Sequence, residues 1–242
     1  MGRSQGSSGL GQLEKGIECV KYTLFCLSAV VWLVGTILFI VSAWLRLEPG
    51  FQEWIEFLDI GEFYIGIDIL IVSSLLVFFI SFVSCASALM EQQLALLVNA
   101  GLQGLCFLLG IIGTIVLLCF STHDSAIQPL IKRSMTNLIV NSHHEHVSVV
   151  LKMVQENIGC CGADGPNDYT NLMKPLPSEC RDSVTGNAFF HGCVDELSWF
   201  LEARAIWVAG LALSLCMMHV VQAVLSLILI EAIKKEEVAY NR

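Results

Sequence analysis

Residues Glu156–Tyr169 read ENIGCCGADGPNDY in a chain that is otherwise mostly apolar. A disulfide needs its two Cβ atoms roughly 3.5 to 4.5 Å apart with a near-perpendicular torsion, and two adjacent cysteines cannot easily meet both conditions. Cys160 and Cys161 therefore need partners elsewhere in the chain. Gly162 can adopt a positive φ where a helix ends, and the letters GPND that follow are a dense turn signal. The pattern predicts a tight turn that disulfides hold in place.

The composition places the rest of the chain in a bilayer. Hydrophobic residues make up 55% of the 242 residues and charged residues only 14%, which is more apolar than a soluble domain of this length requires. Four stretches reach the length of about 20 apolar residues that a hydrocarbon core of roughly 30 Å demands, and none contains Asp, Glu, Lys or Arg. We predict an all-α integral membrane protein whose transmembrane helices are residues 22–45, 69–90, 94–120 and 205–230.

The segments between the spans differ in charge. The N-terminal segment, residues 1–21, and the tail, residues 231–242, hold three lysines or arginines each. Residues 46–68 carry one arginine against six acidic residues. Because positive charge marks the cytoplasmic side, both termini are expected in the cytoplasm, most simply at the plasma membrane. The inner turn is then residues 91–93, and the small and large extracellular loops are residues 46–68 and 121–204.

The large loop contains four of the ten cysteines, at positions 160, 161, 180 and 193. Disulfides form in the oxidising extracellular compartment, and four cysteines allow three pairings. Adjacent cysteines are a poor pair, so two pairings remain open. Upstream, the letters SVVLKMVQENI place apolar residues on one face of a helix. We expect a helical stalk that carries a disulfide-stapled, irregular head.

With these features the chain resembles the tetraspanin family. The resemblance runs from Cys19 to about Ile233 and includes the letters CVKY, SCASALME, CCGADGPNDY, PSEC and GC. It implies that Cys160 pairs with Cys193 and Cys161 with Cys180. It also implies a non-enzymatic organiser that gathers other integral membrane proteins into adhesion, junction or signalling microdomains. Expected partners are adhesion or junction proteins and other tetraspanins.

Polar side chains inside the predicted spans are candidate functional residues. Counting 1.5 Å per residue from each inner end places them very roughly 8 to 18 Å deep, so they can share one layer. Interhelical hydrogen bonding is the favoured interpretation, and the family resemblance adds Ser28 and Gln222 as candidate lining of a sterol-sized cavity. The five residues are Ser28, Asn99, Gln103, His219 and Gln222.

Two further pairs of residues are assigned roles. Cys19 and Cys85 lie at the predicted cytoplasmic ends of their spans, where their thiols are accessible to S-palmitoylation. The alternative is that they serve only as apolar packing residues. Phe189 and Phe190 lie in residues 163–192, the segment between the staples. In an extended segment neighbouring side chains point in opposite directions, so one ring can cover the stalk while the other faces a partner. The alternative is that both rings are buried in the head.

Other functional classes find little support in the sequence. The formal charge of −9 lies mainly on the outer side, which disfavours nucleic acid as a partner. The large loop shows no nucleophile with a base, no paired carboxylates and no ligand cluster at credible spacing, so we expect no enzyme and no cofactor. The letters HHEH at residues 143–146 are expected to be solvated rather than to bind a metal. A four-span channel or transporter component remains the alternative function, although the spans lack the charges that usually mark transport.

Overall fold

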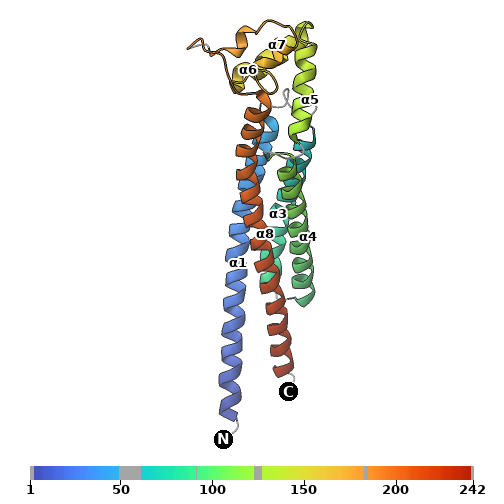
Figure 1. The fold of residues 1–242 in the computed structure, drawn as a ribbon. Coiled ribbons are helices and arrows are strands. Elements are labelled where there is room, and N and C mark those ends of the chain that lie inside the picture. Colours follow the sequence, from blue (N-terminus) through green and yellow to red (C-terminus); the bar gives the residue numbers. More distant parts are fainter. Residues whose placement is uncertain (1–2, 49–60, 91, 123–126, 183–184, 241–242) are drawn as a thin grey trace. The chain divides into compact units, whose positions relative to one another are not determined.

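A computed structural model describes residues 3–48, 61–90, 92–122, 127–182 and 185–240. Its elements are helical and follow one another along the chain as Figure 1 shows. The described residues form no strand beyond one isolated bridge between Arg181 and Ala188, so the all-α fold class is confirmed. The elements are α1 (Arg3–Leu47), α3 (Glu62–Met90), α4 (Gln93–Cys119), α5 (Ile127–Val140), α6 (Glu145–Ile158), α7 (Asn167–Asn171), the short 3-10 helix η1 (Ser178–Cys180) and α8 (Cys193–Tyr240).

Four of these helices are long and apolar enough to cross a membrane, as predicted. Large apolar side chains remain exposed along each of them, among them Ile40, Phe79, Leu108 and Met217. Such a surface is unfavourable in water and suits lipid. The candidate spans are Lys15–Leu47, Phe63–Met90, Gln93–Cys119 and Cys193–Val238. Most of the predicted small loop, residues 49–60, lies outside the described residues.

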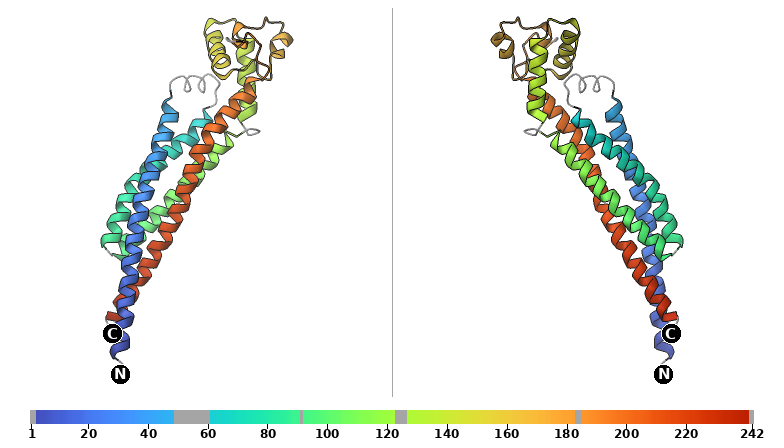
Figure 2. Two further views of the ribbon diagram at one scale, coloured as in Figure 1. Left: turned by 90° about the vertical axis from the view of Figure 1, so that its left-hand side faces the viewer. Right: turned by 90° about the vertical axis from the view of Figure 1, so that its right-hand side faces the viewer.

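The chain divides into two compact units, to which α1, α3, α4 and α8 each contribute. The first unit consists of Met1–Ser42, Asp68–Thr114 and Gly210–Arg242 and is a bundle of four helices. The N-terminal end of α1 and the C-terminal end of α8 lie at the same end of this bundle (Figure 2). At that end Ile17 and Leu24 of α1 form one buried cluster with apolar residues of α8, so helix packing begins before the predicted start of the first span.

Small residues allow the helices of this bundle to approach closely. A Cβ atom added to Gly35 would lie 2.8 Å from Cγ1 of Val77, and one added to Gly110 would lie 2.8 Å from Sγ of Cys216. These separations are shorter than side-chain contacts tolerate. In lipid, where helix association depends on dispersion and hydrogen bonds, such positions let the backbones come together.

The second unit, Ala43–Ile67 and Ile115–Ala209, contains the large-loop elements. We use the word head for the part of this unit that consists of α5, α6, α7, η1, the N-terminal part of α8 and the segments between them. Its core is built from one face of each helix, at the three- and four-residue spacing of an amphipathic helix. The buried apolar residues are Ile127, Ile131, Met135, Leu138 and Ile139 of α5, Val150, Leu151 and Val154 of α6, and Val194, Leu197 and Leu201 of α8.

Candidate functional site: the stapled head and the buried polar layer

Two disulfides close the head. Cys160 pairs with Cys193 and Cys161 with Cys180, and the Cα atoms are 4.9 Å apart in each pair. Of the two pairings that the residues alone left open, this is the one that the family resemblance implies. The adjacent cysteines thus diverge, one to the start of α8 and the other to η1.

The backbone on either side of the adjacent cysteines turns at two positions that require glycine. Helix α6 ends at Gly159, whose φ of 77° is left-handed and whose N–H donates to the carbonyl oxygen of Gln155. Gly162 also has a left-handed φ, of 70°. A Cβ atom there would overlap the carbonyl oxygen of Gly165. Both positions therefore require glycine on conformational grounds, and Gly162 requires it on steric grounds as well.

The carboxylate of Asp168 organises the turn that follows. It accepts hydrogen bonds from the backbone N–H groups of Ala163 and Asp164, both at 2.8 Å. The Gly162 carbonyl in turn accepts the N–H of Cys193 at 3.1 Å. On the outside, the Lys132 ammonium of α5 lies 2.5 Å from Asp164, and this hydrogen-bonded carboxylate raises the pKa of Lys132. The turn is therefore tied to both α5 and α8.

The two phenylalanines differ in their surroundings. The ring of Phe189 is half-buried and lies over Gly159, where an added Cβ atom would be 3.6 Å from the ring. Phe190 is 81% exposed. Its neighbours are anchored, since the N–H of Phe189 donates to the carbonyl of Cys180 at 2.8 Å and the carbonyl of His191 accepts the N–H of Cys161 at 3.0 Å. The head thus presents the aromatic side chain of Phe190 outward on a backbone held from both sides.

Inside the first unit, polar side chains of α3, α4 and α8 form a hydrogen-bonded network. Ser84 donates to Oδ1 of Asn99 at 2.6 Å and accepts from Nε2 of Gln103 at 2.9 Å. Gln103 Oε1 contacts Nδ1 of His219, so that nitrogen carries the proton and the imidazole donates. Asn99 Nδ2 lies 3.4 Å from the Ser226 hydroxyl. The network is almost wholly buried.

A second pair joins α1 to α8. Nε2 of Gln222 donates to the hydroxyl of Ser28 at 3.1 Å, and both side chains are 1% exposed. The other amide atom of Gln222, Oε1, is buried and has no partner among the described residues. An unsatisfied buried acceptor is costly and is a place where a bound group can contribute a donor.

The structure therefore brings together the five predicted polar residues in two hydrogen-bonded groups, and it adds Ser84 and Ser226, which sequence reasoning did not select. A serine in an apolar run looks like any small packing residue. Ser84 is the central member because it bonds to both Asn99 and Gln103, which lie four residues apart on α4. Only the folded structure shows these contacts.

The cysteines that were assigned to lipidation lie in the first unit. Cys19 of α1 is exposed, and Cys85 of α3 is partly buried. An exposed thiol is open to an acyl donor, so the geometry is compatible with modification at Cys19 and gives less access at Cys85.

Comparison with known proteins places these features in a family. Residues 20–232 match the family model described as the Tetraspanin family. The chain is 50% identical over 237 residues to Tetraspanin-2A of Drosophila melanogaster, which covers 98% of this chain and 97% of the relative. It is 22% identical over 247 residues to the CD81 antigen of Homo sapiens, covering 93% and 99%. It is 23% identical over 222 residues to the 23 kDa integral membrane protein of Schistosoma japonicum, covering 90% and 94%.

Proposed function

The chain belongs to the tetraspanin family, and from this premise we propose that it binds partner membrane proteins, laterally and through the head, and assembles them into microdomains. Family membership itself supports the coarser role of a membrane organiser without catalytic activity. The proposed setting is the plasma membrane, with both termini in the cytoplasm and the head outside. Adhesion and junction proteins and other tetraspanins are the proposed partners.

Phe190 is the observation that carries the proposal. Its ring is 81% exposed, and an exposed aromatic side chain in a segment held on a rigid scaffold is a common anchor of protein interfaces. The staples and the flanking backbone hydrogen bonds fix the backbone that carries this ring, so little backbone conformational entropy is lost when a partner covers it. Aromatic residues at the centre of an interface commonly cost about 2 kcal/mol or more when they are truncated.

Crosslinking in intact cells, followed by mass spectrometry, tests the proposal. Phe190→Ala should lower the yield of captured membrane proteins roughly thirtyfold at an unchanged surface level, because about 2 kcal/mol is lost. Val149→Ala, which shortens a side chain of α6 that is 48% exposed, is the matched control and should capture normally. Phe189→Ala should instead reduce the surface level, because its ring packs on Gly159. Unchanged capture by Phe190→Ala would refute recognition through this ring.

A sterol is a second proposed ligand, in the membrane unit. The unpartnered Oε1 of Gln222 can accept a hydrogen bond from a sterol hydroxyl, and Ser28 lies beside it. Labelling by a photoreactive sterol should fall in Gln222→Leu, which removes the acceptor and keeps the volume. Equal labelling of Gln222→Leu and the wild type would exclude this acceptor.

The alternative, a channel or transporter component, is less well supported. The buried polar side chains of α3, α4 and α8 use one another as hydrogen-bond partners. Ion flux across a reconstituted bilayer would favour the alternative over an organiser.

A further inference from the structure

The turn that ends α7 has an unusual backbone conformation. Met173 has a left-handed φ of 53°, and it is the one non-glycine residue with a positive φ in the part of the chain that the structure describes. A left-handed residue after a helix is usually glycine and sometimes asparagine, because other side chains are crowded by the backbone in this conformation. Helix α6 ends in the same way on Gly159. A methionine at position 173 is therefore held there at a cost in free energy.

The side chain of Met173 contributes little to the fold. It is 96% exposed, so packing does not offset the strained backbone. The left-handed conformation itself serves the turn, in which the N–H of Met173 donates to the carbonyl of Thr170 at 3.0 Å and the N–H of Lys174 donates to that of Tyr169 at 2.8 Å. Glycine or asparagine can form the same backbone bonds. A conformational outlier that stability does not explain indicates a functional role for the side chain.

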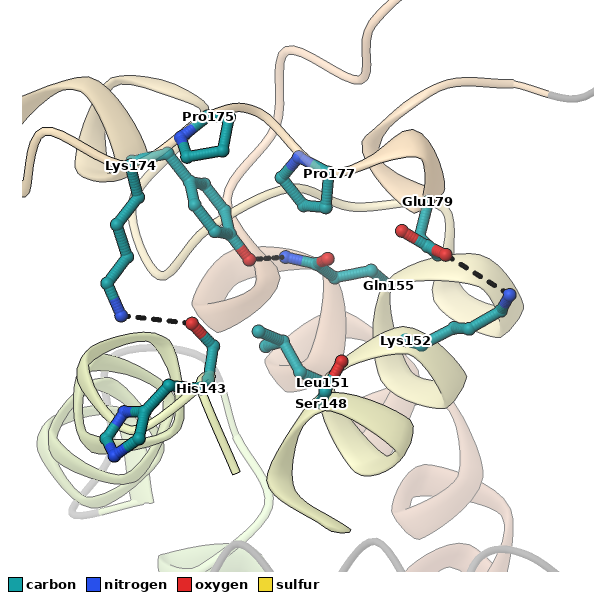
Figure 3. Close-up of a pocket in the computed structure, with 11 residues that line it drawn as sticks. His143, Ser148, Leu151, Lys152, Gln155, Lys174, Pro175, Pro177 and Glu179 are labelled. Carbon is teal, nitrogen blue, oxygen red and sulfur yellow. Dashed lines mark hydrogen bonds and ion pairs between the residues drawn. The ribbon is translucent and has the colours of Figure 1, made fainter. Parts of the chain in front are cut away.

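The turn is fixed against the end of α5. Nζ of Lys174 donates to the carbonyl oxygens of Ile139 and Val140, both at 2.7 Å, and to Oγ of Ser142 at 3.0 Å. Figure 3 shows the Lys174 side chain reaching toward the turn that contains His143, beside a pocket of about 360 Å³ between α6 and the segment after α7. A contact surface on a backbone held in this way loses little conformational entropy when a partner covers it.

The surface beside Met173 is apolar and uncharged. Leu172 is 40% exposed, and Val140, whose carbonyl accepts from Lys174, is 46% exposed. Asn171 is exposed and neutral. The three protons of the Lys174 ammonium are engaged by the three acceptors named above, so this residue offers no free charge. On a chain with a formal net charge of −9, this neutral surface is complementary to an apolar partner surface rather than to a charged one.

We propose that Met173 is a contact residue for a partner membrane protein and inserts its thioether side chain into an apolar pocket of the partner's extracellular part. Methionine suits this role because its unbranched, polarizable side chain adapts to irregular apolar surfaces. The inference rests on the proposed function in that the occupant of the site belongs to a partner protein. It concerns a different turn from the one that carries Phe190, so the two contacts are tested by different variants.

The test places a photoreactive side chain beside Met173 in the full chain, in intact cells. Asn171→p-benzoylphenylalanine is the parent variant, and mass spectrometry identifies the peptides that become crosslinked to it. The principal adduct should be an apolar, uncharged peptide from the extracellular part of another membrane protein. In isotonic medium in which sucrose replaces most of the salt, the yield of this adduct should change less than about twofold, because an apolar contact is not screened by ions.

Three variants of this parent separate recognition from folding. Met173→Gln keeps the length of the side chain and the strained backbone but adds a polar amide, and it should lower the adduct yield roughly tenfold at an unchanged surface level. Met173→Leu retains an apolar side chain and should preserve most of the yield. Val149→Gln makes a similar replacement at another exposed apolar side chain of the head and should leave the yield unchanged.

Hydrogen exchange shows whether the Met173 side chain is needed for the fold. In Met173→Asn the amide of Lys174, which reports on the turn, should exchange no faster than in the wild type, because asparagine tolerates the left-handed conformation. Faster exchange in this variant would assign Met173 a structural role and overturn the proposal.

The crosslinking can also overturn it. A lipid adduct, an adduct with a second copy of this chain, no adduct, a severalfold rise in yield at low salt, or an equal yield in Met173→Gln would each exclude the proposed contact. An equal yield in Met173→Gln leaves partner capture through Phe190 standing, and unchanged capture by Phe190→Ala leaves the adduct at position 171 standing.

Discussion

Replacing Gly162 with alanine should open the head, and the structure offers a control of the same backbone conformation. Gly162 and Gly186 both have a φ of 70°. Alanine in this left-handed region costs about 1 to 2 kcal/mol at either position. At Gly186 nothing lies within 4 Å of the added Cβ atom, so that cost is the whole expected effect.

At Gly162 a steric cost is added. The new Cβ atom would overlap the carbonyl oxygen of Gly165, so the turn must shift. Such a shift disturbs the two hydrogen bonds that Asp168 accepts, each worth about 1.5 to 3 kcal/mol because the acceptor is charged. If the shift costs the equivalent of one of these two hydrogen bonds, Gly162→Ala destabilises the head by about 2 kcal/mol more than Gly186→Ala does.

Hydrogen exchange of the full chain in nanodiscs measures this difference. The amides of Cys193 and Val194 report on the turn, since they donate to the carbonyls of Gly162 and Ala163. Their opening equilibrium should rise roughly thirtyfold more in Gly162→Ala than in Gly186→Ala, which is the equivalent of about 2 kcal/mol. Equal exchange in the two variants would show that the turn absorbs the Cβ atom and that the steric argument is wrong.

Three further predictions concern other parts of the molecule. Acyl exchange should label the wild type and lose most of its signal in the Cys19→Ser, Cys85→Ser double variant; undiminished labelling would assign the acyl groups to other cysteines. Ser84→Ala leaves Oδ1 of Asn99 and Nε2 of Gln103 buried without the serine to which they bond and should destabilise the bundle by about 1 to 3 kcal/mol in thermal unfolding, whereas Ser214→Ala at an exposed site should have little effect. A hydrogen bond from its own backbone holds the pKa of Glu179 below its usual 4.5. The ionised carboxylate therefore stabilises the head above pH 4.5, and this stabilisation is lost as the pH falls through the lowered pKa. Glu179→Gln should therefore weaken the head at pH 7 but not well below pH 4.5, and an equal loss at both would disprove the role of the charge.

The four membrane-crossing helices are visible in the sequence because a bilayer imposes a length and a composition that few other structures share. Helix ends are not visible in the same way. The last span was predicted from residue 205, yet α8 begins at Cys193. Val194, Leu197 and Leu201 are buried in the head, and this amphipathic stretch runs on into the apolar run without a break in the helix.

The site was only partly predictable, because its chemistry depends on contacts between distant segments. The two cysteines and the glycine that follows them indicate a stapled turn by themselves. Nothing local, however, indicates that Gln155 meets Tyr169 or that Ser84 joins Asn99 to Gln103. Such contacts arise only when helices pack, so neither the pocket nor the central serine could be found from residue spacing.

Two-colour single-particle tracking in living cells measures whether this chain assembles with partner proteins through the head. The principal crosslinked membrane protein and this chain are labelled and followed at matched surface levels. The two should move together for many frames, and Phe190→Ala should abolish this joint motion while Val149→Ala preserves it. Independent diffusion of the wild-type chain and its crosslinked neighbour, or joint motion that Phe190→Ala leaves unchanged, would contradict assembly through the head.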